Sequence, residues 1–313
     1  MATTLIDIVN SVNCSASAIL GTGLKHCKTD IKRVTTLGLI ERGLIFDNTK
    51  ALNLAYIQEL QQKNQLIILQ GVVEMIDNTA EDTIITRAGS GEKIVAGKNP
   101  YEYQATFDNG LNFHKALTSL SSHRQFDLIM WDSKGDAIFT QNKAGAFKGF
   151  TLGMFENGKY TMSNGADASS QSVSFQLINR LEFDERVSWV IAENLDYNAQ
   201  EDLDGINDVA FTFKTFTAGT SLTFKAVSVA DNHQISLSGL LKTDLLYYVD
   251  GVVTVPTTLV ESVTEAGLYT LTVPAFTAGK VLKLKTWNTT LQCNAIKLSG
   301  ALYESNLATV TAV

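Results

Sequence analysis

The stretch VSFQLINRLEFDERVSWVI, residues 173–191, decides the fold class expected for this chain. Eight of its ten odd-numbered positions are apolar, and seven of its nine even-numbered positions are polar. Successive side chains of a β-strand point to opposite faces of a sheet, so this alternation predicts a strand with one buried face. The length predicts one unusually long strand or two strands in phase, broken near Asp184 and Glu185.

The polar face of this predicted strand carries Arg180, Glu182, Asp184 and Arg186, an alternating row of acids and bases. A carboxylate that acts as a general acid needs a desolvated pocket that raises its pKa. Rows of alternating charge are more typical of a solvated or interfacial surface. We therefore predict that these four side chains lie on a solvated or interface face and not in a catalytic centre.

The composition is that of a β-rich globular protein with room for two domains. The chain has 313 residues, of which 45% are hydrophobic and 18% charged, and only three are proline. The net charge of −7 argues against a nucleic-acid-binding surface, but it does not exclude a surface that DNA passes. The sequence contains no apolar run of about 18 residues, so we expect no membrane span.

The start of the chain and its cysteines indicate synthesis in a reducing cytoplasm. No basic residue precedes Lys25, and Asp7 lies in the opening stretch, which is not the pattern of a signal peptide. The three cysteines, Cys14, Cys27 and Cys293, are widely spaced and odd in number, so they do not describe a disulfide framework.

Residues 34–162 predict strands and two helices. Residues 82–108 have the pattern of a long hairpin with GSG at its tip. The other predicted elements are a strand and turn at 34–47, helices at 49–63 and 111–122, a strand at 64–77 interrupted by Gly71, a hairpin at 126–140, and strands at 148–162 with a turn at ENGK.

The tip of the long hairpin is rich in turn residues and lies between alternating strands. This pattern, and a length beyond that of a tight hairpin, suggest that residues 78–99 form an arm extended between subunits of an assembly. The candidate contact residues of the arm are Arg87, Gly89, Ser90, Gly91, Glu92 and Lys93.

The C-terminal third of the chain has a different organisation. Residues 193–208 hold six acids and no base, which indicates an interdomain boundary, and residues 209–300 read as roughly seven short strands with regular turns. The predicted domains are a β domain over 1–198, in which 1–33 is unplaced, an acidic linker over 199–208, and an immunoglobulin-like β-sandwich over 209–313.

Nothing in the sequence predicts a catalytic, metal or cofactor site. Cys14, His26 and Cys27 lack the close pairs and the fourth ligand of a structural zinc site, so packed thiols are expected. The acidic run DLDGIND fails the register of a calcium loop and is interpreted as a solvated linker. No Ser–His–Asp, Cys–His or nucleophile-elbow pattern surrounds any of the four histidines.

The order of elements over residues 30–191 resembles the tail tube (major tail) proteins of tailed bacteriophages. The segments that carry the resemblance are TIITRAGSGEKIVAGKNPYEYQATFDNG, the helix FHKALTSL, LIMWDSKGDAIFTQN with the later KGFTLGMF, and QLINRLEFDERVSWV. The resemblance covers about 160 residues and rests on pattern rather than on an invariant motif. Residues 1–33 have no counterpart in it.

The resemblance implies a mainly β fold: a tail-tube-like β-sandwich or barrel with one or two short helices, followed by an immunoglobulin-like β-sandwich. It implies a structural virion protein, made in the host cytoplasm and not an enzyme, whose hexameric rings stack into a tail tube. The face with Arg180, Glu182, Asp184 and Arg186 would line the bore of the tube or a subunit interface. DNA would pass through the bore without specific binding, and the outer domain would decorate the tail. Implied partners are further copies of the chain, a tape measure protein and a tail terminator.

Other functions remain open at this point. The chain could be another tail or connector component of the same fold, or a surface or secreted β-rich adhesin. A hydrolase acting on a surface polymer, with Glu182 or Asp184 as the acid, is a further alternative.

Overall fold

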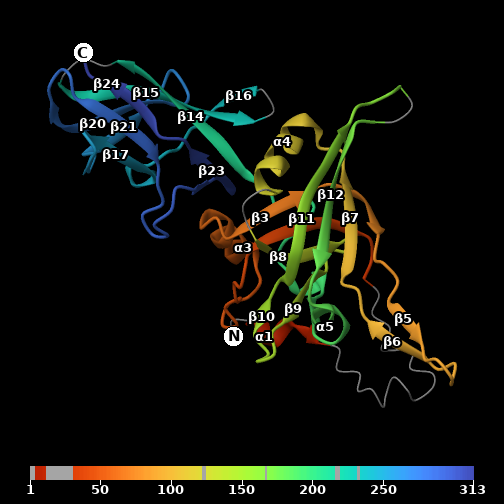
Figure 1. The fold of residues 1–313 in the computed structure, drawn as a ribbon. Coiled ribbons are helices and arrows are strands. Elements are labelled where there is room, and N and C mark those ends of the chain that lie inside the picture. The colour runs from red at the N-terminus through yellow and green to blue at the C-terminus, as the bar shows by residue number, and fades with distance from the viewer. Residues whose placement is uncertain (1–3, 12–30, 122–124, 166–167, 216–218, 231–232) are drawn as a thin grey trace. The chain divides into compact units, whose positions relative to one another are not determined.

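The computed structural model describes residues 4–11, 31–121, 125–165, 168–215, 219–230 and 233–313, and the fold is mainly β, as predicted (Figure 1). The chain divides into two compact units. Unit 1 contains Met1–Ile57 and Gln65–Leu203, and unit 2 contains Gln58–Asn64 and Asp204–Val313.

The elements up to residue 194 include most of those expected from the sequence. In chain order they are α1 (Leu5–Ile8), β1 (Asn10–Ser11), β2 (Val34–Glu41), α3 (Leu54–Gln62), β3 (Leu66–Gln70), β4 (Val72–Asp77), β5 (Thr83–Thr86), β6 (Lys93–Gly97), β7 (Tyr101–Phe107), α4 (Gly110–Ser121), β8 (Phe126–Asp132), β9 (Ala137–Gln141), β10 (Phe147–Lys148), β11 (Phe150–Thr161), β12 (Ser170–Leu177), α5 (Arg180–Asp184), β13 (Val187–Val190) and η1 (Ala192–Asn194).

The main sheet of unit 1 curls into a barrel-like layer. Its strands run in the order β1-β13-β9-β8-β11-β12-β7-β4, and β2 pairs with both β8 and β3. Strand β3 continues into β4 through Gly71, where the predicted interruption lies. Gly71 has φ +81, and a Cβ there would lie 2.8 Å from Asn109 Oδ1, so glycine is required at this bend. The circuit from β2 through β3, β4, β7, β12 and β11 to β8 therefore returns to β2.

The inner face of this layer forms the hydrophobic core of unit 1. Leu39, Phe107, Leu128 and Phe175 are fully buried within it. Helix α4, predicted over 111–122, contributes Leu117 to the same cluster, and Phe113 and Leu120 pack against it. Burying large apolar side chains on one face of each strand is what the alternating sequences require.

The segment of residues 173–191 is not a strand throughout. Residues 173–191 form the end of β12, then the helix α5, then β13. The prediction of one long strand, or of two strands in phase, is therefore wrong for residues 180–184. Alternation fails there because Glu182, expected on the wet face, is 5% exposed, whereas Leu181, expected in the core, is 46% exposed.

The turn predicted at ENGK is also wrong. Residues 156–159 lie inside β11, which continues to Thr161 and pairs with β12 across an irregularity between Asn157 and Tyr160. A Cβ at Gly158 would lie 2.5 Å from Ser172 Oγ, so glycine permits a close approach of two strands here. Asn-Gly in this sequence marks a bulge instead of a hairpin turn.

Part of the N-terminal segment that the sequence left unplaced is ordered on unit 1. Leu5 and Ile8 of α1 are buried, and the Leu5 amide donates to the Lys50 carbonyl. Strand β1 pairs antiparallel with β13. The packed thiols and the histidine considered as metal ligands, Cys14, Cys27 and His26, lie outside the described residues.

Unit 2 contains two sheets that enclose a separate core. Strands β19-β20-β15-β14-β23-β22 form one sheet, with β16 paired to β15, and β18-β17-β21-β24 form the other. Phe224, Tyr247, Leu271 and Leu282 are buried in the core. The bounds are β14 (Ile206–Thr215), β15 (Gly219–Ala230), β16 (His233–Ser236), η2 (Lys242–Asp244), β17 (Leu245–Val249), β18 (Val252–Thr254), β19 (Thr258–Glu261), β20 (Leu268–Phe276), β21 (Val281–Thr286), β22 (Ile296–Leu298), β23 (Ala301–Ser305) and β24 (Ala308–Thr311).

This sandwich has more strands than the seven expected, and one pair, β14 with β23, is parallel. The acidic segment before it also differs from a solvated linker. Tyr197, Ala199 and Leu203 are buried, and the two units divide between Leu203 and Asp204. The prediction counted only the charges of the segment and not these apolar side chains. They pack into unit 1, whereas the acids of the segment are exposed.

Candidate functional site

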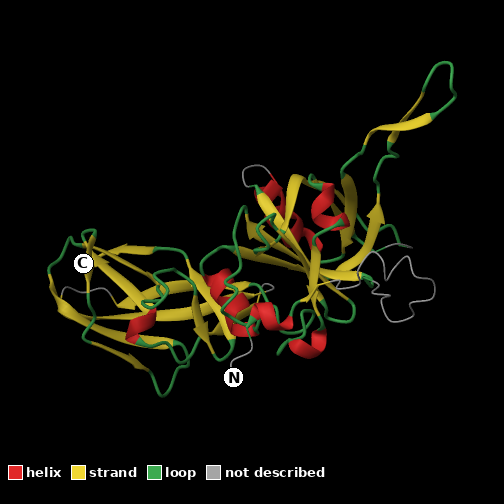
Figure 2. Ribbon diagram, turned by 90° about the horizontal axis from the view of Figure 1, so that it is seen from below, coloured by secondary structure: helices red, strands yellow, loops and turns green. Residues whose placement is uncertain are grey.

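The arm predicted over residues 78–99 is an isolated two-stranded hairpin. Strands β5 and β6 pair with each other, and no other described strand pairs with either of them (Figure 2). Its tip is closed by the Arg87 amide, which donates to the Glu92 carbonyl. The predicted contact residues from Arg87 to Lys93 are all exposed and stand at this tip.

Aliphatic side chains of the arm face solvent. Ile84, Ile85 and Val95 are 58%, 52% and 54% exposed. An isolated two-stranded hairpin is marginally stable in water, and neighbouring exposed aliphatic residues mark an interaction surface. The arm is therefore an isolated hairpin whose aliphatic side chains are left open to solvent.

The two ends of the hairpin, the feet of the arm at residues 78–82 and 98–100, are joined by hydrogen bonds. The Asn99 amide donates to Asp82 Oδ1 at 3.1 Å, and Asn99 Nδ2 donates to the Glu81 carbonyl at 2.6 Å. Closer to the main sheet, the Thr79 hydroxyl accepts a hydrogen bond from the amide of Glu102, the second residue of β7, at 3.0 Å. The two feet are thus tied to each other and to the start of β7.

Helix α5 binds these feet through Arg180, one of the four predicted face residues. Arg180 Nη1 donates to Asp82 Oδ1 at 2.6 Å and to the Asn99 carbonyl at 3.3 Å. Its Nε donates to Asp184 Oδ2 at 3.3 Å, and its guanidinium lies 4.8 Å from the centre of the Tyr101 ring. We call Arg180, Asp82, Asp184 and Tyr101 the arm clamp.

Hydrogen bonds within the arm clamp shift the pKa values of Asp82, Arg180 and Tyr101. The hydrogen bond from Arg180 lowers the pKa of the Asp82 carboxyl, and the same bond raises the pKa of Arg180. Tyr101 donates its hydroxyl to Asp184 Oδ1 at 2.6 Å, which raises the pKa of Tyr101 because ionisation would break this bond. The contact between Asp82 and Arg180 is therefore an ion pair at neutral pH, and Tyr101 is the neutral donor beside it.

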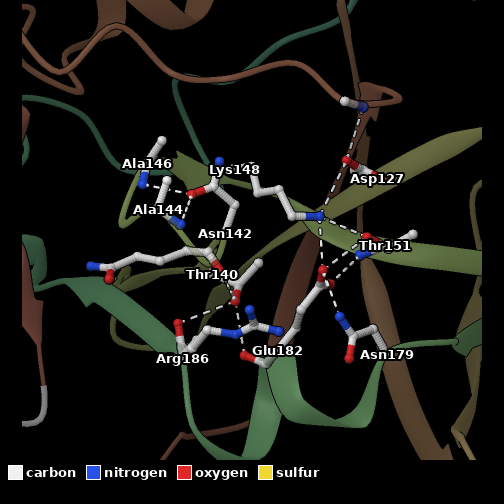
Figure 3. A network of polar contacts seen from close by, with 12 residues as sticks. Asp127, Thr140, Asn142, Ala144, Ala146, Lys148, Thr151, Asn179, Glu182 and Arg186 are labelled. Carbon is white, nitrogen blue, oxygen red and sulfur yellow. Dashed lines mark hydrogen bonds and ion pairs between the residues drawn. The ribbon is translucent and has the colours of Figure 1, made fainter.

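The opposite side of α5 enters a buried charge network (Figure 3). Glu182 pairs with Lys148 at 2.9 Å and accepts hydrogen bonds from the Thr151 amide at 2.8 Å and the Thr151 hydroxyl at 3.0 Å. Lys148 also lies 3.8 Å from Asp127, which is 1% exposed. A helix of five residues thus contacts the arm on one side and the protein interior on the other.

Asp127 is the less favourably placed acid of this network. Its Oδ2 accepts from the Gly43 amide at 3.1 Å, but its buried Oδ1 has no hydrogen-bond partner. Burial raises the pKa of Asp127, although the Gly43 amide and Lys148 act in the opposite direction.

Replacing Asp127 by asparagine is expected to make the protein relatively more stable as pH rises. A carboxyl whose pKa is raised on folding contributes stability below its ordinary pKa near 3.8, and this contribution is lost as pH rises through the folded pKa. Asp127→Asn removes that loss. Urea unfolding of both proteins at several pH values between 4 and 8 measures the difference. A difference that stays constant, or that moves toward the wild type at higher pH, would contradict the assignment.

The four predicted face residues do not share one face. Arg180 and Asp184 belong to the arm clamp, and Glu182 is buried against Lys148. Arg186 lies beyond the helix, where its carbonyl accepts from the Gln141 amide and its Nε is buried without a hydrogen-bond partner. The prediction of a single row of alternating charge on a strand is therefore wrong, because α5 turns these side chains in different directions.

Sequence reasoning missed a different polar surface, the outer face of the sheet β4-β7-β12-β11. Residues that stand opposite one another in this sheet form three rows of mostly polar side chains. The charged members of these rows are glutamates, and none of the rows contains lysine or arginine. We call this surface the acidic face. Its first row is Glu74, Thr106 and Ser172, its second row is Ile76, Gln104, Ser174 and Glu156, and its third row is Glu102, Gln176 and Met154.

A signal for the acidic face was present in the sequence. The alternation of YEYQATF (101–107) and SQSVSFQL (170–177) marks one apolar and one polar face on each strand. What the sequence did not supply is the register that brings Glu74, Glu102 and Glu156 onto the same surface.

A pocket of about 280 Å³ lies beside the start of β2, and among the described residues that line it there is no serine, cysteine or histidine. Within the described parts of the chain, no three histidine, cysteine, aspartate or glutamate side chains are grouped to hold a metal ion. In the same residues no helix is both long and apolar enough to cross a membrane. The pocket is lined by Ile31, Lys32, Arg33, Val34, Met75, Asp77, Tyr103, Met130 and Phe183.

Comparison with models of known protein families finds none that matches this chain, and no curated protein matches it either.

Proposed function

We propose that this chain is a structural subunit that self-associates into rings, and that the rings stack into the tail tube of a bacteriophage. The observation that carries the proposal is the arm: a hairpin with both strand edges unpaired in the described chain and with exposed aliphatic side chains. Such a hairpin gains hydrogen bonds and buries apolar surface when a second copy binds it. The arm would connect neighbouring subunits or successive rings.

The sheet of unit 1 offers a second surface for assembly. Strand β4 is an end strand of the sheet order, and Val73 and Ile76 on it are 49% and 40% exposed. An open sheet edge invites pairing with another chain, and a closed ring of subunits removes such edges. A hexameric ring is the arrangement that the resemblance to tail tube proteins implies.

The acidic face suits the lining of a bore through which DNA passes. Its glutamates repel the phosphates of DNA, and its rows of serine, threonine and glutamine interact well with water. A surface of this kind keeps DNA mobile because it provides no cation for a phosphate to bind. In this proposal the acidic face replaces the row of residues 180–186 as the bore lining.

The proposal assigns the two units different tasks. Unit 1 forms the tube and contacts a tape measure protein and a tail terminator, and unit 2, the β-sandwich, decorates the tail of the virion. The related possibility of another tail or connector component rests on the same arm and differs in whether rings stack.

Negative-stain electron microscopy of the purified protein tests the proposal directly. Rings, or tubes with a regular axial repeat and a central bore, are the expected result. Rings that never stack would favour a connector, and single dispersed subunits at high concentration would exclude self-assembly and favour an adhesin. Gel filtration with light scattering gives the subunit number independently of the grid.

A further inference from the structure

The arm clamp connects a protruding hairpin to the interior of unit 1 through one side chain. Arg180 contacts Asp82 on the foot before β5 and the Asn99 carbonyl on the foot after β6. Both contacts come from Nη1, so a single nitrogen of α5 contacts both feet. The remaining hydrogen bonds of the feet join them to each other and to β7, and the contacts of Arg180 join them to α5.

Arginine is suited to this position in a way that lysine is not. The guanidinium uses Nη1 for the feet, Nε for Asp184 and its face for the Tyr101 ring. These three contacts fix the position and the plane of the group, whereas an ammonium is a point charge without a plane. Asp184 is held in turn by the Tyr101 hydroxyl, so the acceptor of Nε is also fixed.

Helix α5 itself is held firmly. Glu182 is buried and pairs with Lys148, and Phe183 packs edge-on against Tyr101 with ring centres 5.4 Å apart. The helix is therefore a fixed point to which the arm is attached.

We infer that Arg180 is a positioning residue that sets the direction of the arm before a second subunit binds. The role in assembly rests on the proposed function, whereas the ordering of the feet does not. Without Arg180 the hairpin remains paired but turns about its feet. Association then slows, because a partner meets an arm that samples many directions.

Hydrogen exchange on the unassembled protein, isolated by gel filtration, measures the ordering of the feet. In Arg180→Gln, peptides that cover residues 78–82 and 98–101 are expected to exchange about tenfold faster than in the wild type. Peptides at the tip, residues 87–92, should exchange as before. The matched control is Arg87→Gln, which removes the exposed tip pair with Glu92 at 3.2 Å and should leave the feet unchanged. If Arg180→Gln does not fold, Arg180→Lys provides the same comparison with the charge retained.

Assembly kinetics, followed by light scattering, measure the consequence. Tube formation by Arg180→Gln should be slower than that of the wild type by about one order of magnitude, with final tubes of normal diameter. The double variant Asp82→Arg with Arg180→Asp exchanges the two charges. It should restore both the slow hydrogen exchange of the feet and the rate of tube formation, because the guanidinium introduced at position 82 can then contact the carboxylates at positions 180 and 184.

The outcomes separate this inference from the proposed function. Feet that exchange at the wild-type rate in Arg180→Gln would overturn the role of Arg180, and so would loosened feet with unchanged assembly kinetics. A wild-type protein that never assembles would overturn the proposed function, and the exchange rates of the feet would still decide whether Arg180 orders the arm.

Discussion

Shortening the arm is expected to give a folded protein that no longer forms rings or tubes. The variant replaces residues 86–95 by Gly-Gly, which removes the tip together with Ile94 and Val95, the partners of Ile85 and Ile84, and joins Ile85 to Ala96. None of the replaced residues belongs to the hydrophobic core of unit 1, so the free energy of unfolding should change by less than about 1 kcal/mol. Circular dichroism and urea unfolding check the fold, and electron microscopy with gel filtration checks assembly.

A second variant separates the apolar contacts of the arm from its length. Ile84→Asn with Ile85→Asn keeps the hairpin but removes two exposed aliphatic side chains, each worth about 1.5–3 kcal/mol when buried by a partner. Assembly should again fail. Ile235→Asn is the matched control, because Ile235 is 61% exposed in unit 2 and lies outside the arm. Normal tubes from the shortened arm would show that the arm is not the connector.

Removing the buried cation beneath α5 is expected to have the largest effect on stability. Lys148→Met leaves Glu182 and Asp127, which are 5% and 1% exposed, without their common counter-charge. Breaking a buried ion pair on one side typically costs about 3–5 kcal/mol. Urea unfolding followed by tryptophan fluorescence measures this loss, since Trp131 and Trp189 both belong to unit 1.

Two further variants test whether that loss of stability comes from the buried charges. Combining Lys148→Met with Asp127→Asn and Glu182→Gln removes all three charges and should recover much of the stability, because neutral replacements of a buried cluster are often tolerated. Arg87→Met breaks an exposed pair of unit 1 and should cost at most about 1 kcal/mol. Equal stability losses for Lys148→Met and Arg87→Met would mean that the network is not buried in solution.

The parts of the fold that sequence predicted correctly depend on local chemistry. The arm hairpin was predictable because its glycines and its alternating strands lie within sixteen residues of each other. Helix α4 was predictable from an apolar stripe at helical spacing, and the interruption at Gly71 from a glycine inside an apolar strand. Each of these signals is complete within its own segment.

Helix α5 was not predictable in the same way. Over five residues an alternating pattern and one helical turn place charges at similar intervals, and the choice depends on contacts distant in sequence. Glu182 meets Lys148, 34 residues earlier, and Arg180 meets Asp82, 98 residues earlier. The same limit applies to the acidic face, whose glutamates come from three strands joined only by the register of the sheet.

The two-sided helix α5 has a mechanical consequence for a protein that carries tension along its arm. The contacts of Arg180 with the feet are partly open to water, whereas the contacts of Glu182 are buried. Water competes for the outer contacts, so they rupture at a lower force than the inner ones. The contacts of Arg180 can therefore open while those of Glu182 stay closed. In the proposed tube, such a difference would allow a stack of subunits to bend without loss of the fold of unit 1.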